Sequence, residues 1–264
     1  MAQWQKQANN LTLKAPDYLS ASSISTFHQC PLKYKYSRID GIKEPATFAT
    51  LVGTIVHEIL EVFYKLHPDE RTVQMARYLA GDIWAKFQDE AGQAVRNKQE
   101  EIRDMRWQIW FCLENVWRLE DPQTINFDGT ETEFNRAIDG VMVKGIIDRW
   151  NIDKHGRVNI SDYKTGKVPR RQWQGDKFDQ LIIYGILTSD EFNKPIGNLD
   201  LLYLKEGVRL SCVPTEDDIQ RVKQQIVTTR AMIDERCESG VFEAKPSPLC
   251  GWCHFKTICP VWSK

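Results

Sequence analysis

Residues 145–166, GIIDRWNIDKHGRVNISDYKTG, decide the fold and the chemistry of this chain. Asp148 ends an apolar run of the strand type, and Asp162 lies on the next such run, after thirteen intervening residues. Alternation along a strand puts Asp162 and Lys164 on one face and Tyr163 on the other. If the two strands are neighbours, the two carboxylates converge, and carboxylates are the ligands that Mg²⁺ or Mn²⁺ prefers. Such a cation acidifies water and neutralises charge on a phosphate, while Lys164 could stabilise the developing negative charge.

Taken one at a time, the polar residues have plainer interpretations. An Asp-x-Lys sequence is more often a surface ion pair on an edge strand than a catalytic site. His57 lies in a strongly apolar helical stretch, and a single histidine there is more often a core residue with a satisfied hydrogen bond. Gln180 and Tyr184 are spaced to share one helix face, which alone is unremarkable. Each residue gains weight only beside the others.

The rest of the chain predicts helices, then strands mixed with helices. We expect strands over 130–152, 157–164 and 199–212, with tight turns at Asp139-Gly140 and near Glu206-Gly207. We expect helices over 20–38 with a break at Pro31, over 50–66, twice within 71–120, and over 177–189 and 215–238. Residues 1–19 are expected to be irregular. The last 25 residues lack helical or strand periodicity, so something other than an apolar core must hold them.

Composition excludes several classes of protein. With 42% apolar and 27% charged residues in a chain of 264, a disordered chain is excluded. No window of about 18 residues is apolar and uncharged, which excludes a membrane span. The first residues lack the apolar stretch of a signal peptide, so we expect a cytoplasmic protein. The net charge of −1 excludes attraction of nucleic acid by the whole surface but allows a local basic groove.

Three of the seven cysteines form a Cys-x2-Cys-x5-Cys pattern, made of Cys250, Cys253 and Cys259. Such thiolates can reach one metal centre, and Cys30, which like Cys259 precedes a proline, is the best candidate for a fourth ligand. Four thiolates accept either Zn²⁺ or an iron–sulfur cluster, and His254 could replace one of them in a zinc site. A site of this kind would clasp the two ends of the chain together. The remaining cysteines fit small core positions: Cys112, Cys212 and Cys237.

The order of these motifs along the chain resembles that in the RecB-like branch of the PD-(D/E)XK nuclease superfamily. The matching segments are the Ser-rich run 20–25 with Cys30-Pro31, Gly53 to His57 (Gly-x3-His), Gly145 to Asp148 (Gly-x2-Asp), 162–166 (Asp-Tyr-Lys-Thr-Gly) and Gln180 to Tyr184 (Gln-x3-Tyr). The four cysteines resemble the iron–sulfur subset, seen in AddB-type helicase-nucleases and CRISPR-associated RecB-like exonucleases. The match spans residues 20–260.

The resemblance implies an α/β fold with a restriction-endonuclease-like core, in which helices flank a mixed central sheet. It implies a single nuclease domain over 1–264. Within it we expect a helical lobe at 51–120 and a nuclease core at 127–240. Residues 20–40 together with 241–264 would form the iron–sulfur region, a clasp at the C-terminus.

The resemblance also implies roles for single residues. His57, Asp148, Asp162 and the Tyr163 carbonyl would bind Mg²⁺ or Mn²⁺, and the catalytic residues would be Asp148, Asp162 and Lys164. Gln180 and Tyr184 would support the site or contact DNA. Cys30, Cys250, Cys253 and Cys259 would hold a 4Fe-4S cluster, which tips the balance between zinc and iron toward iron. Glu133, with Glu131 nearby, is a weaker match to a glutamate that some members carry before Asp148, because exposed strand glutamates are common.

A basic stretch follows the lysine strand and predicts a place for DNA. Residues 164–177, KTGKVPRRQWQGDK, hold five basic residues against one acidic residue, and Arg170, Arg171 and Trp173 lie among them. Basic groups suit a strand backbone, and an aromatic ring suits a stacked base. A second basic stretch at 33–43 is interleaved with tyrosines, and there a solvated surface is slightly favoured.

Together these patterns predict a metal-dependent DNA exonuclease that acts on single-stranded or frayed ends, in recombination, repair, phage DNA processing or CRISPR adaptation. No Walker A pattern is present, so the chain has no motor of its own. The alternative is a non-catalytic DNA-binding or assembly module with a structural metal cluster, and a zinc-stabilised interaction protein is a third interpretation. The expected partners are DNA and proteins of CRISPR adaptation, recombination or phage replication. A homo-oligomer, such as a ring that threads single strands, stays open.

Overall fold

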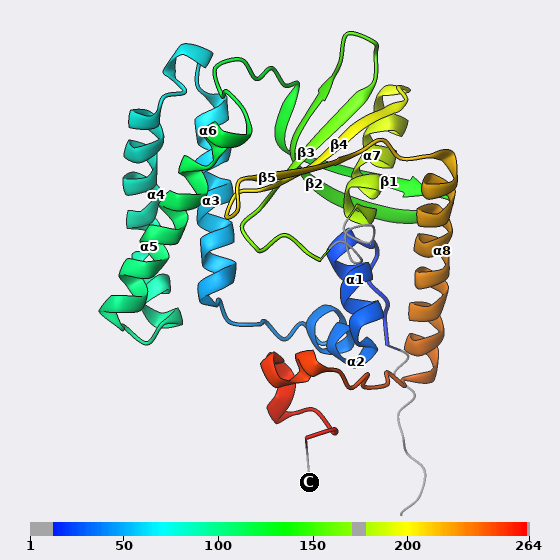
Figure 1. The fold of residues 1–264 in the computed structure, drawn as a ribbon. Coiled ribbons are helices and arrows are strands. Elements are labelled where there is room, and N and C mark those ends of the chain that lie inside the picture. Colours follow the sequence, from blue (N-terminus) through cyan, green and yellow to red (C-terminus); the bar gives the residue numbers. More distant parts are fainter. Residues whose placement is uncertain (1–12, 171–177, 263–264) are drawn as a thin grey trace, which may run out of the picture.

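The computed structural model describes residues 13–170 and 178–262. It has one five-stranded sheet, and this sheet lies between two groups of helices (Figure 1). In chain order the elements are α1 (Ala21–Gln29), α2 (Pro31–Tyr34), α3 (Phe48–Lys65), α4 (Val73–Ala94), α5 (Gln99–Glu114), α6 (Val116–Leu119), β1 (Gly129–Ile138), β2 (Val141–Ile152), β3 (Val158–Lys164), α7 (Asp179–Phe192), β4 (Ile196–Tyr203), β5 (Val208–Cys212) and α8 (Glu216–Ser239). Short 3₁₀ turns follow α8. No helix among the described residues is long and apolar enough to cross a membrane.

The sheet has the strand order β1-β2-β3-β4-β5. Its pairs are antiparallel except β3 with β4, which are parallel and joined by α7, because parallel neighbours need a crossover connection. On one face α7 packs on four of the strands, with α1 and α8 beside it. On the other face α3, α4 and α5 form a lobe with its own apolar cluster, which includes Tyr163 and Leu202 of the sheet and Leu204 just after β4. The predicted mixed sheet flanked by helices is confirmed.

Local sequence explains where key elements begin. Ser20 starts α1 through a capping box with Ser23. Pro31 stands in the first turn of α2, where a missing N–H is tolerated. Asp139 and Gly140 have φ values of 47° and 83°, as the two-residue turn between β1 and β2 requires. These features agree with the expected boundaries.

Three details differ from the expectation. α7 runs to Phe192 rather than residue 189, because Asn193 ends it in a left-handed conformation with a φ of 51°. β4 begins at Ile196 rather than residue 199. Leu19, expected in an irregular leader, is buried and forms a parallel bridge with Val143 of β2.

Gly145 of β2 gives a first prediction, because α7 packs directly on it. A Cβ atom there would lie 2.8 Å from the ring of Tyr184 and 3.1 Å from Leu187. Gly145→Ala should therefore lower the free energy of unfolding by about 1–3 kcal/mol, as overpacking does, and lower Tm. Gly81→Ala on α4 is the matched control, since its Cβ meets nothing within 4 Å and alanine is the better helix former by up to about 1 kcal/mol. Equal Tm values for the two variants would contradict this packing.

Candidate active site

The site begins where β2 and β3 stop pairing. The last pair of their ladder is Arg149 with Ser161, so Asp148 and Asp162 are the next residues on the two strands. The backbone N–H of Tyr163 donates to Asp148 Oδ2 at 2.7 Å. The Asp148 carboxylate thus replaces the backbone acceptor that a continued ladder would have offered.

Leu19 bounds the opening at its other end. On the side of β2 away from β1, Leu19 donates its N–H to the Met142 carbonyl at 2.9 Å and accepts from the Lys144 N–H at 2.8 Å. Residues 145–148 of β2 therefore lie between two backbone partners, with β3 after them and Leu19 before them. The opening therefore lies within the sheet, and these two backbone partners bound it.

A third carboxylate, Glu131 of β1, completes a row across three strands. Glu131 and Asp148 are not themselves partners in the ladder, but the pairs on either side, Thr130 with Arg149 and Thr132 with Ile147, put them opposite each other. Glu131 has a φ of 44°, a left-handed conformation that costs a residue other than glycine about 1 kcal/mol or more, and it faces a like charge, which is also unfavourable. Two unfavourable features at one position indicate a functional constraint. Glu133, the stronger candidate in the sequence, instead pairs with Lys144 at 2.7 Å on the surface.

Helix α3 brings His57 to this row. Its Nδ1 lies 3.4 Å from Asp148 Oδ1 and 3.7 Å from Glu131 Oε1. Its Nε2 lies 3.0 Å from the Tyr163 carbonyl oxygen, to which a protonated ring donates. Burial lowers the pKa of His57, but hydrogen bonds to Asp148 and Glu131 outweigh it and raise the pKa to about 10. While no cation is bound, the charged ring balances part of the negative charge of the carboxylates; a cation held by this ring would take the place of one of its protons.

The second half of the site lies toward α7. Lys164 Nζ is 2.6 Å from Asp162 Oδ2 and donates to Gln180 Oε1 at 3.0 Å. The Gln180 amide donates to Asp162 Oδ1 at 3.2 Å and to Tyr184 Oη at 2.8 Å. Burial and repulsion from Asp148 raise the pKa of Asp162 to about 6, although Lys164 opposes the shift. Asp162, Lys164, Gln180 and Tyr184 thus form one connected group.

The donor set fits a hard divalent cation. Among the described residues, His57, Glu131 and Asp148 place ligand atoms within 4.8 Å of one another. Asp162 Oδ2 is buried and accepts no hydrogen bond, since its contact with Lys164 has the distance of an ion pair without hydrogen-bond geometry. Clustered, incompletely bonded carboxylate oxygens are what Mg²⁺ or Mn²⁺ binds. Of the predicted metal ligands, His57 and Asp148 belong to this group together with Glu131, whereas the Asp162 carboxylate lies outside it and contacts Lys164 and Gln180.

A buried ion pair between Arg149 and Glu120 supports Tyr163 on the side of the sheet that faces the helical lobe. Arg149 donates to the two oxygens of Glu120 at 2.6 and 2.8 Å and to Tyr163 Oη at 2.9 Å. Tyr64 of α3 also donates to Glu120, and its ring stacks on that of Tyr163. Burial alone would raise the pKa of Glu120, but hydrogen bonds and charge from Arg149 lower it below its ordinary value. This network ties α3 to β3.

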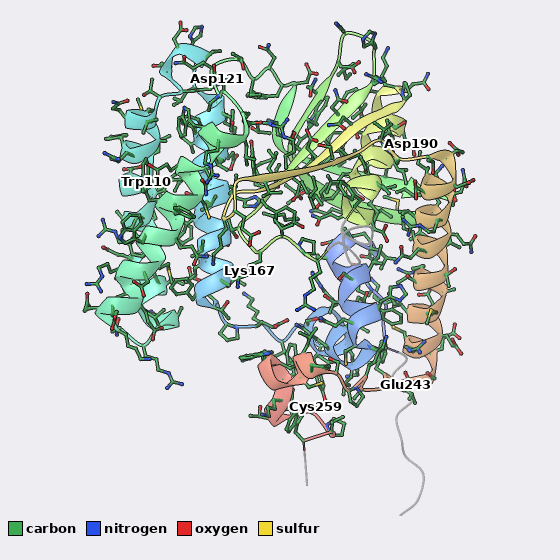
Figure 2. All side chains as sticks on the ribbon, in the orientation of Figure 1. Trp110, Asp121, Lys167, Asp190, Glu243 and Cys259 are labelled. Atoms are coloured by element: carbon green, nitrogen blue, oxygen red, sulfur yellow. The ribbon has the colours of Figure 1, made fainter. Side chains whose placement is uncertain are left out.

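The four predicted cluster cysteines line one cavity of about 220 Å³ beside α2. Figure 2 places Cys259 in the C-terminal segment that lies next to α1 and α2. The backbone N–H groups of Lys245 and Ser247 donate to the Sγ atoms of Cys30 and Cys250, at 3.4 and 3.3 Å. The two ends of the described chain therefore meet at these cysteines.

The predicted DNA contacts are only partly described. Arg170 is exposed, and Arg171 and Trp173 lie outside the described residues. In the second basic stretch, Lys35 pairs with Asp40 at 2.7 Å. That pairing fits the solvated surface that the sequence slightly favoured there.

The chain is similar to a known protein family and to several known proteins. The family model described as the PD-(D/E)XK nuclease superfamily matches residues 18–260, a range that contains the whole site. The crystal structure of a candidate exonuclease from Eubacterium rectale superposes with a TM-score of 0.59 and 13% identity, over 96% of this chain and 93% of that one. At that identity, the likeness shows the fold alone.

Three curated proteins are similar in sequence. The Gene 69 protein of Mycobacterium phage L5 is 24% identical, and the match covers 92% of this chain and 96% of the phage protein. The Gene 69 protein of Mycobacterium phage D29 is 26% identical with the same coverage. One subunit of an ATP-dependent helicase/deoxyribonuclease of Streptococcus mutans is 26% identical over 61% of this chain, but that match spans only 15% of the longer protein.

Glu120→Gln tests the network behind the site. The variant leaves Arg149 buried without its partner charge, so the free energy of unfolding at neutral pH should fall by about 3–5 kcal/mol. Because the pKa of Glu120 is lowered in the folded protein, its ionised form stabilises the fold above the ordinary glutamate pKa, and this contribution is lost as the pH falls through the lowered value. Denaturant unfolding at a series of pH values measures both effects.

The difference in the free energy of unfolding between the parent and Glu120→Gln should therefore become smaller as the pH is lowered. Glu133→Gln is the control, because the pair of Glu133 with Lys144 is exposed to solvent and should contribute little at any pH. A difference that stays constant down to strongly acidic pH would contradict the ionic role of Glu120.

Proposed function

The chain belongs to the PD-(D/E)XK nuclease superfamily, and from that membership we propose that it is a metal-dependent deoxyribonuclease that cuts from single-stranded or frayed DNA ends. The observation that carries the proposal is the row of Glu131, Asp148 and Asp162 across three adjacent strands, with Lys164 beside the last of them. A phosphate is itself an anion, so such a row can accept one only with a cation between them.

The proposed cation ligands are His57, Glu131, Asp148, Asp162 and the carbonyl of Tyr163. When bound, Mg²⁺ or Mn²⁺ supplies an acidified water and neutralises charge on the phosphate. The protein's own contribution is to hold the ligand groups in position. The sheet holds the three acids at one level on three strands, and α3 adds the imidazole from the lobe.

Lys164 is the proposed catalytic lysine. Asp162 and Gln180 hold its ammonium group at 2.6 and 3.0 Å, so the charge stays beside the carboxylate row. An ammonium in this place can orient the attacking water or stabilise the negative charge that develops on the phosphate. Gln180 is itself bonded to Tyr184, which packs over Gly145, so α7 positions the lysine.

The relatives favour DNA and its ends as the substrate. The Streptococcus mutans relative is named as part of a helicase/deoxyribonuclease, and the Eubacterium rectale structure is that of a candidate exonuclease. The two mycobacteriophage proteins match along nearly their whole length, which favours phage DNA processing among recombination, repair and CRISPR adaptation. Absence of a Walker A pattern from the sequence favours an enzyme without its own motor.

We also propose that Cys30, Cys250, Cys253 and Cys259 hold a 4Fe-4S cluster. All four line one cavity, and backbone N–H groups donate to two of the sulfur atoms, as they do around thiolate-bound clusters. Around Zn²⁺, with Zn–S bonds of about 2.3 Å, the sulfurs would lie about 3.8 Å apart. Within the described chain, no three of these sulfurs lie within 4.8 Å of one another.

Removing the lysine or its carboxylate should abolish hydrolysis. Lys164→Ala and Asp162→Ala should each lower the rate by about a hundredfold or more, because the transition-state charge loses its stabilising partners. The measurement is the initial rate on end-labelled linear single and double strands with Mg²⁺ or Mn²⁺, with circular DNA as a substrate that has no ends. Parent rates in both variants would refute the site, and equal rates on circular DNA would refute the need for ends.

Two glutamates on β1 provide a matched control for the metal ligands. Glu131→Gln should lower the rate strongly and raise the Mg²⁺ concentration needed for half-maximal activity, because it removes one charge from the row. Glu133→Gln, two residues along the same strand, should keep the parent behaviour, because Glu133 pairs with Lys144 outside the site. The opposite result would move the metal position to Glu133.

The cluster has a direct optical test. Purified protein should be brown, absorb broadly near about 400 nm and contain about four iron atoms per chain. Cys259→Ser should lose this absorption, whereas Cys212→Ser, on β5 and outside the cavity, should keep it. A colourless parent protein with stoichiometric zinc would refute the cluster and leave the nuclease proposal standing, since Zn²⁺ has no visible absorption.

A further inference from the structure

A groove of about 470 Å³ lies between α4 and α5 in the helical lobe. None of its lining residues belongs to the candidate active site. Figure 2 labels one of its residues, Trp110, on α5. Its floor includes Gly81, where a Cβ would meet nothing within 4 Å. The side chains that give the groove its character are Arg77, Trp84, Arg103, Arg106, Trp107 and Trp110.

The charged side chains of α4 and α5 are unevenly distributed between the groove and the rest of the two helices. Together α4 and α5 carry seven acidic and four basic side chains, so their overall charge is negative. Yet three of the four basic side chains line the groove, and among the described residues no acidic side chain does. Asp89 lines the adjoining hollow beyond Trp84, which marks the end of the basic stretch. The groove is therefore a local positive surface on a chain with a net charge of −1.

Arginine and tryptophan also alternate across the groove. Arg77 of α4 lies over the ring of Trp110 of α5, 4.6 Å from its centroid. Arg106 of α5 lies over the ring of Trp84 of α4, at 5.7 Å. These reciprocal pairs hold the walls of the groove in place. Packing does not explain Trp107, whose large apolar side chain is 62% exposed on the same groove.

We propose that this groove binds single-stranded DNA at a distance from the cutting site. The exposed indole ring of Trp107 suits a stacked base, and the arginines beside it suit the phosphates of the same strand. The lining residues of α5 run from Gln99 to Trp110, about 16 Å at 1.5 Å per residue, which leaves room for a few nucleotides of a single strand. The proposal rests on the proposed function, because it takes the same single strand as its ligand. A second copy of this chain is the competing occupant.

The test measures binding without cutting. Full-length protein carrying Lys164→Ala is titrated, without divalent ions, against a fluorescein-labelled oligothymidine of about 30 nucleotides, and anisotropy is recorded at several salt concentrations. Adding Trp107→Ala should weaken binding about fivefold to a hundredfold, the effect of one lost stacking contact. Adding Arg103→Gln should reduce the slope of log K against log salt by about 0.7, the effect of one lost phosphate contact.

Two matched controls come from α4, the other helix of the groove. Tyr78 is 68% exposed on α4 but does not line the groove, so Tyr78→Ala should bind as the parent does. Lys86 is the fourth basic residue of the two helices and also lies outside the groove, so Lys86→Gln should keep the salt slope. Circular dichroism melting of each variant confirms that it is folded.

The outcomes separate this proposal from the nuclease proposal. If the parent with Mg²⁺ or Mn²⁺ cuts no DNA while binding depends on Trp107 and Arg103, the proposed function fails and the groove assignment holds. If the parent cuts DNA and both groove variants bind like the parent, the groove assignment is overturned. It is also overturned if Trp107→Ala changes the sedimentation of the protein from dimer to monomer with DNA affinity unchanged, because the groove is then a contact between copies.

Discussion

The separation of β2 from β3 beyond Arg149 and Ser161 is the constraint on which the site depends. A continued ladder would close the space between the strands, and the Tyr163 N–H would find a backbone acceptor. Because pairing stops there, the Asp148 carboxylate takes that N–H and is fixed by it at the mouth of the opening. Leu19 occupies the edge of β2 at the other end of the opening through its hydrogen bonds with Met142 and Lys144, so β3 cannot pair with that part of β2. Tyr184 of α7 packs on Gly145 between these two partners.

The opening brings three carboxylates closer together than strands exposed to solvent would hold them. Glu131, Asp148 and Asp162 repel one another, and Glu131 adopts a left-handed conformation to take its place in the row. His57 and Lys164 offset part of the repulsion by direct contact. The rest is sustained by the packing of two layers around the sheet, so the fold gives up stability at this point to hold an arrangement ready for a cation.

Much of the local structure around the site could be predicted from short-range patterns in the sequence. The Asp139-Gly140 turn, the capping Ser20 and the alternation of β3 follow from the local preferences of the backbone. The third acid could also have been predicted. A two-residue turn pairs Ile138 with Val141, so counting seven residues outward on each strand sets residue 148 opposite Glu131 and not Glu133.

The separation of β2 and β3 could not be predicted in the same way. It depends on α7 packing on Gly145 and on Leu19 reaching the edge of β2, contacts between segments that are distant in the sequence. The groove on the lobe was missed for a similar reason. Its tryptophans and arginines lie on two separate helices with many acidic neighbours, and only the packing of α4 against α5 sorts the charges.

The lobe and the sheet are coupled through α3, which is largely apolar and buried against α4 and α5. His57 is its polar contact with the carboxylate row, and Tyr64 is its contact with the Glu120–Arg149 pair behind Tyr163. Displacing the lobe would therefore remove the imidazole from the site and one ring of the stack that supports Tyr163. By linkage, a cation that binds the assembled row must also stabilise the docking of α3 on the sheet. The helices that surround the proposed DNA groove are thus held in place partly by the chemistry of the site itself.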